Sequence, residues 1–167
     1  MLNNNYFIAS KHFLIIFILS IFLVACDKGS EDSKVVEVEK SVPTLNDENI
    51  QDFTTEMAKD YTAKLDSLMV AFNQAKKDDD AIKFVNFRNF EWTPAYIKQK
   101  DFYQKVLAKN PSFLSKSTSR PLFDVYENLI YIGIGLKNAL LDKDDAKLQT
   151  QLAEIQKDKA ILNGLID

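Results

Sequence analysis

Hydrophobic and polar positions follow a helical period over most of this chain. From residue 46 onward, large apolar side chains recur every three or four positions, which places them on one face of an α-helix. The pattern predicts an all-α fold, a bundle of four or five mostly antiparallel helices that follows a flexible tether. The helices are expected over residues 46–75, 80–91, 93–109, 121–141 and 144–165.

Polar residues and prolines indicate where these helices begin and end. Asp80 can cap the second helix, and Asp142 or Asp144 can cap the last one. Thr93-Pro94 is typical of a new helix start, because proline is favoured at the first helical position. A long loop is expected over residues 110–121.

The helix over 121–141 is apolar on two sides and is expected to be the buried centre of the fold. It contains Gly133 and Gly135, and each glycine inside a helix costs about 1 kcal/mol relative to alanine. Close approach of a neighbouring helix would offset this cost. A kink that lines a cavity is the alternative.

The first residues have a different pattern. A polar lead is followed by an uncharged apolar run over residues 13–24, as in a secretory signal peptide. The run is shorter than the ~20 residues that a membrane-spanning helix needs. It ends in Leu23-Val24-Ala25-Cys26, which resembles the lipobox of bacterial lipoprotein precursors. An uncleaved N-terminal anchor with an incidental thiol is the alternative.

The lipobox resemblance implies a processed and lipidated protein. Residues 1–25 would be removed as the signal peptide, and Cys26 would carry acyl chains such as palmitate. Asp27 resembles the signal that retains lipoproteins in the inner membrane of enteric bacteria, although the outer membrane stays possible. Residues 26–45 then form a charged, flexible tether with a maximum length of about 65 Å, and residues 46–167 form the helical domain.

Composition narrows the chemistry of the mature chain. It keeps all 24 acidic residues but 20 of the 21 basic ones, a net charge of −4 that argues against nucleic acid as a partner. The only histidine, His12, leaves with the signal peptide, and Cys26 is the only cysteine. Triad catalysis and His-ligated zinc are therefore excluded, and the aspartate-rich turns lack the spacing of a calcium loop. We expect no enzyme, no metal and no cofactor beyond the covalent lipid.

Aromatic residues concentrate in residues 84–103. Most are expected to be core, but Trp and Tyr close to an Arg are also the residue types that anchor protein interfaces. A partner-binding site is therefore expected here. Its candidate residues are Phe84, Phe87, Arg88, Phe90, Trp92 and Tyr96.

Two acids could support a different function. Glu127 lies on an apolar stripe, where burial would suit the single-acid chemistry of lytic transglycosylases, and Glu91 is the other candidate. The serine that follows the acid in those enzymes is Asn128 here. An ion pair of Glu127 with Arg120 or Lys137 is the simpler explanation.

The sequence thus predicts a lipid-anchored cell-envelope protein, periplasm-facing in a Gram-negative cell, whose helical domain binds an envelope protein. An inhibitor or immunity protein against an envelope-targeting toxin is a specific version. One alternative is a carrier or assembly factor that holds an apolar ligand near Gly133 and Gly135. Another is a carboxylate-based glycan-cleaving enzyme.

Overall fold

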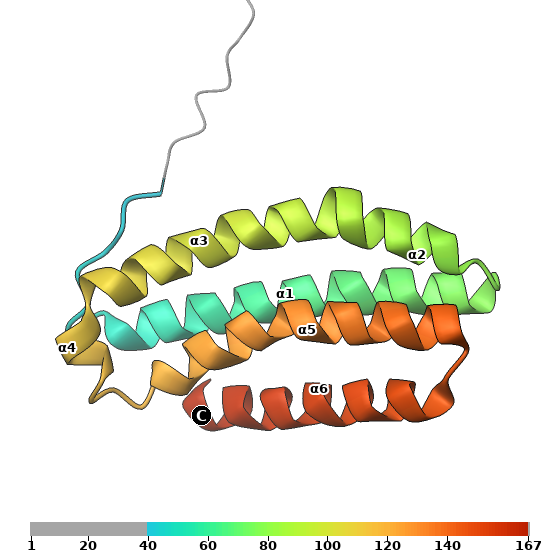
Figure 1. The fold of residues 1–167 in the computed structure, drawn as a ribbon. Helices are drawn as coiled ribbons and strands as arrows, with labels where there is room; N and C mark the ends of the chain where they lie inside the picture. The colour runs from blue at the N-terminus through green and yellow to red at the C-terminus, as the bar shows by residue number, and fades with distance from the viewer. Residues whose placement is uncertain (1–39, 167) are drawn as a thin grey trace, which may run out of the picture. The chain divides into compact units, whose positions relative to one another are not determined.

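Residues 40–166 are described by a computed structural model, and they form an all-α bundle (Figure 1). Successive long helices run antiparallel, which confirms the predicted fold class. The elements are α1 (Ile50–Lys77), α2 (Ala81–Phe87), the π-helical turn η1 (Arg88–Trp92), α3 (Thr93–Lys109), α4 (Pro111–Leu114), α5 (Arg120–Asp142) and α6 (Asp145–Ile166).

Several predictions concern residues outside the described range. The signal peptide, Cys26, Asp27 and the tether up to residue 39 all lie there. Within residues 40–166, no helix combines the length and the apolar character that crossing a membrane requires.

The segments α2, η1 and α3 form one continuous rod, so the helix start predicted at Thr93-Pro94 was wrong. Trp92 and Thr93 both have α-helical backbone angles. Pro94 lacks an N–H and would clash with the carbonyl four residues earlier in a regular helix. In η1 the Thr93 N–H instead donates to the Arg88 carbonyl, five residues back. This wider turn accommodates the proline without ending the helix.

The predicted aspartate caps are confirmed. The Asp80 carboxylate accepts a hydrogen bond from the Lys83 N–H at 3.1 Å at the start of α2. Asp144, rather than Asp142, caps α6, because its Oδ1 accepts from the N–H groups of residues 146 and 147 at 3.0 Å each. The loop expected over 110–121 is partly helical, since it contains α4 and the first residues of α5.

The flexible tether predicted over residues 26–45 was wrong for its last six residues, because residues 40–45 pack onto the bundle. We call this segment the N-terminal strap. Leu45 is buried, and the Lys109 ammonium donates to the Val42 carbonyl at 2.8 Å. The sequence did not predict this packing, because the apolar residues of the segment are flanked by polar ones.

Asn110 holds the strap in place. Its Oδ1 accepts from the buried Leu45 N–H at 2.8 Å. Its Nδ2 donates to the Pro43 carbonyl at 3.1 Å and to the Val106 carbonyl at 2.8 Å. One buried amide thus satisfies backbone groups of the strap and of the last turn of α3.

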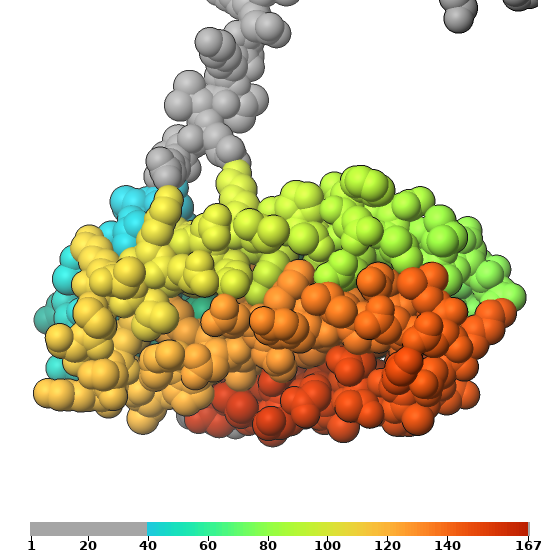
Figure 2. Space-filling model, viewed as in Figure 1, coloured from blue at the N-terminus to red at the C-terminus, as the bar shows by residue number. Residues whose placement is uncertain are grey.

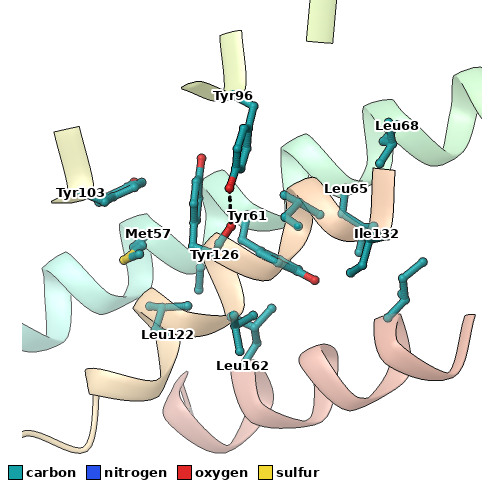
Figure 3. Close-up of a cluster of buried hydrophobic side chains, with 14 of the residues drawn as sticks. Met57, Tyr61, Leu65, Leu68, Tyr96, Tyr103, Leu122, Tyr126, Ile132 and Leu162 are labelled. Carbon is teal, nitrogen blue, oxygen red and sulfur yellow. Dashed lines mark hydrogen bonds between the residues drawn. The ribbon is translucent and has the colours of Figure 1, made fainter. Parts of the chain in front are cut away.

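Stacked aromatic rings join the rod to α5, and Figure 3 shows two of them, Tyr96 and Tyr126. Trp92 stacks on Tyr96 with ring centroids 5.1 Å apart, and Tyr96 stacks on Tyr126 at 5.8 Å. The Tyr96 hydroxyl donates to the Tyr126 carbonyl at 3.1 Å. The Trp92 indole N–H donates to the Lys64 carbonyl of α1 at 2.9 Å. These contacts fix the rod against both α1 and α5.

Both glycines of α5 lie at close contacts, as expected. A Cβ at Gly133 would stand 3.3 Å from Arg88 Nε and 3.5 Å from Leu68 Cδ2. A Cβ at Gly135 would overlap the side chain of Gln151 on α6. Neighbouring side chains fill the space beside both glycines, so no cavity opens at either of these positions.

A buried carboxyl group links three helices. Asp158 on α6 is only 3% exposed, and its Oδ2 accepts from the Tyr61 hydroxyl of α1 at 3.0 Å and from the Asn128 amide of α5 at 3.2 Å. Burial raises the pKa of Asp158 above that of an ordinary aspartate, and the two hydrogen bonds oppose this effect. Folding therefore shifts this carboxyl toward its protonated form relative to the unfolded chain.

The variant Asp158→Asn is expected to gain stability relative to the wild type as the pH rises. A carboxyl whose folded-state pKa is raised contributes most stability below its unfolded pKa, and loses that contribution as the pH rises through the folded pKa. Asparagine does not titrate and still offers Tyr61 an acceptor. Between about pH 4 and pH 8, the free energy of unfolding of the variant relative to wild type should increase by about 1 kcal/mol. Urea unfolding at several pH values tests this, and a difference that is constant with pH would contradict it.

Candidate protein-interaction surface

The six residues of the predicted aromatic site all belong to the rod, but they do not share one surface. Four are buried with exposed fractions of 8% or less, namely Phe84, Arg88, Trp92 and Tyr96. Phe87 is half-buried against the core. Phe90, in contrast, is 77% exposed. Most aromatic residues of this segment were expected to be core, and among these six only Phe90 is largely exposed.

The position of Phe90 follows from the π-helical turn. Arg88 and Trp92 both point inward from the two ends of η1, and Phe90 lies midway between them on the opposite side of the rod. Since the turn is continuous with α2 and α3, the exposed ring projects from a rigid helix and not from a loop.

Two residues of α3 extend this exposed face. Pro94 and Ile97 follow Phe90 by four and seven positions, the spacing that keeps side chains on one face of a helix. Both are exposed, Ile97 at 47%. The outward-facing side of the rod is therefore apolar over about two helical turns.

Tyr131 on α5 is also exposed, at 63%, and lies close to Tyr96 of α3. The Lys100 ammonium of α3 lies 3.1 Å from the Glu127 carboxylate of α5, and the two helices run antiparallel in adjoining bands of the surface (Figure 2). Tyr131, one turn beyond Glu127, is thus level with Ile97. Burial raises the pKa of Tyr96, and Glu127 and Tyr131 add to this shift because both lie close by. We call Phe90, Pro94, Ile97 and Tyr131 the outer patch.

Comparison with other proteins gives no family for this chain. No protein family, curated protein or solved structure matches it. The outer patch is therefore described from its geometry alone, without support from a related protein.

The two candidate acids lie in exposed positions. Glu127 is exposed, so the burial considered for it is wrong. Its carboxylate pairs with Lys100 and not with Arg120 or Lys137, so the expected ion pair is also wrong. Arg120 pairs with Asp124 at 2.6 Å instead. Glu127 lines a cleft of about 70 Å³, well below the ~300–1,000 Å³ of typical ligand pockets. Glu91 is exposed on η1.

A larger cleft of about 250 Å³ lies where the α1–α2 turn meets the α5–α6 turn. Its lining mixes apolar side chains such as Phe72 and Leu148 with charged ones. The Lys143 ammonium lies 2.9 Å from the Asp79 carboxylate and joins the two turns. Across residues 40–166, no group of three acids is placed to hold a metal ion. The acids of these turns make helix caps and surface ion pairs.

Pro94, Ile97 and Tyr131 were not predicted from the sequence. The first two share a helical face with Phe90, but only if the rod is continuous, and Thr93-Pro94 indicated a break. Tyr131 is brought close to α3 by the packing of α3 on α5, and no local sequence pattern predicts this packing.

Proposed function

We propose that this protein is a lipid-anchored cell-envelope protein whose helical domain binds a partner protein through the outer patch. The observation that carries the proposal is the exposure of Phe90 on a rigid helix. Aromatic side chains dominate the binding energy of protein interfaces, and a preorganised surface loses little conformational entropy on binding. Nothing in the fold requires an apolar ring at this position.

The lipobox resemblance supports location in the cell envelope, and Asp27 favours the inner membrane. Because the N-terminal strap packs on the bundle, only residues 27–39 separate Cys26 from the domain. Thirteen residues span at most about 45 Å. This length limits how far the domain can move from the membrane, and a partner that is membrane-bound or comes close to the membrane suits this limit.

An inhibitor or immunity protein against an envelope-targeting toxin is the specific version of this proposal. Such a protein needs a rigid binding surface near the membrane and no catalytic group. The outer patch and the short tether meet the first need. The lack of histidine and free thiol in the mature chain agrees with the second.

Photo-crosslinking tests the outer patch directly. With a benzophenone amino acid in place of Phe90 or Ile97 in the full-length protein, cells should yield the same crosslinked partner at both positions. Val70 is the matched control, because it is an apolar residue 70% exposed on α1. Equal crosslinking at position 70, or no crosslink at positions 90 and 97, would contradict the proposal.

A further inference from the structure

Arg88 is a buried cation that lacks a counter-ion among the described residues. Its side chain is 8% exposed, and its Nε is buried without a hydrogen-bond acceptor. Nη1 donates to the Asn89 side-chain oxygen at 2.9 Å. No carboxylate within residues 40–166 lies within ion-pair distance. Buried arginines are normally paired, because an unpaired buried charge is costly.

Three unfavourable features converge on this guanidinium. The π-helical turn η1 begins at Arg88, and regular α-helix is the more stable conformation. Gly133 weakens the middle of α5 but leaves room for the guanidinium, since a Cβ there would stand 3.3 Å from Nε. Burial also lowers the pKa of Arg88, which means that its charged form is disfavoured. Selection for stability alone would replace such a residue with an apolar one.

We propose that Arg88 and Asn89 form an oxyanion-binding site where η1 packs against α5, and that this site takes a carboxylate or phosphate group. The guanidinium provides the charge and planar donors that both groups require. Asn89 is exposed, and its side-chain oxygen holds Nη1, so the guanidinium lies just beneath the surface at this residue. The Asn89 amide nitrogen supplies a further donor to the bound oxyanion.

This site is separate from the outer patch. Arg88 points into the bundle, and Phe90, two residues later, points out from the opposite side of the rod. Loss of oxyanion binding therefore leaves Phe90 in place, and loss of partner binding at Phe90 leaves Arg88 in place. The two proposals can fail independently.

The arginine Nε–H resonances provide a direct test. The chain contains only two arginines, Arg88 and Arg120, so a ¹H–¹⁵N spectrum of the mature lipoprotein in detergent holds two such signals. The variants Arg88→Met and Arg120→Met assign them. Sodium acetate and sodium phosphate are titrated separately, with sodium chloride at equal ionic strength as the control. We expect the Arg88 signal to shift and saturate at millimolar concentrations of at least one oxyanion, while the Arg120 signal follows ionic strength only.

Thermal unfolding provides the second measurement. At tenfold excess over the dissociation constant, the oxyanion should raise the wild-type melting temperature by about 3–6 °C and that of Arg88→Met by none. In chloride alone, Arg88→Met should melt at or above the wild-type temperature, because it removes an unpaired buried charge.

The choice of anion identifies the source of the ligand. Saturation by acetate alone assigns a carboxylate, and saturation by phosphate alone assigns a phosphate group. An Arg88 signal that neither anion moves beyond the chloride control would overturn the proposal, whether or not Arg88→Met folds.

Discussion

Trp92→Ala is expected to lower the free energy of unfolding by about 3–5 kcal/mol, the usual cost of truncating a buried tryptophan. Trp92 is 3% exposed, stacks on Tyr96 and donates to the Lys64 carbonyl. The variant loses this packing and leaves that carbonyl without its indole donor. Because small domains have about 5–15 kcal/mol of total stability, the urea midpoint should fall markedly.

Phe90→Ala is the matched control for Trp92→Ala. Both residues are aromatic and lie in the same π-helical turn, but Phe90 is exposed. Its truncation should change the free energy of unfolding by no more than about 0.5 kcal/mol. Equal losses in the two variants would show that the two side chains do not differ in burial as described.

Asn110→Ala is expected to cost about 2–4 kcal/mol and to release the N-terminal strap. The substitution removes three hydrogen bonds and leaves the buried Leu45 N–H without an acceptor. Each buried polar group left unsatisfied costs about 1–3 kcal/mol. Hydrogen exchange should show loss of protection at the Leu45 amide, and urea unfolding should report the cost.

Lys109→Ala is the control for the strap. Lys109 donates one exposed hydrogen bond to the Val42 carbonyl, so its loss should change stability by about 0.5 kcal/mol or less. A Leu45 amide that stays equally protected in Asn110→Ala would contradict the assignment of Asn110 as the residue that holds the strap.

The sequence predicted what depends on local chemistry. The start of α5 at Arg120–Pro121 and the cap at Asp144 follow from the preference of proline and aspartate for the first turn of a helix. Packing at Gly133 and Gly135 was predictable because glycine inside a helix needs a compensating contact. Each of these features depends on residues close together in the chain.

The features that were missed depend on contacts between distant residues. Thr93-Pro94 is compatible with a helix start and with a π-helical turn, and the burial of Trp92 and Tyr96 on one continuous rod decides between them. The strap forms because Leu45 meets an asparagine 65 positions later.

The candidate site was only partly predictable for the same reason. The aromatic segment identified Phe90, but the phase of its neighbours around the rod depends on η1. Three of those neighbours point inward at intervals of four residues, namely Arg88, Trp92 and Tyr96. A break in the helix would have disturbed this spacing. Tyr131 reaches the outer patch through tertiary packing alone.

The affinity of Phe90→Ser for the partner identified by crosslinking is the most direct test of the central claim, that Phe90 serves binding and not folding. We predict a dissociation constant at least about 30-fold weaker than wild type, as expected of an interface hot spot, with an unchanged urea midpoint. Val70→Ser should bind as wild type does. An unchanged dissociation constant in Phe90→Ser, or a loss of affinity matched by a loss of stability, would contradict the claim.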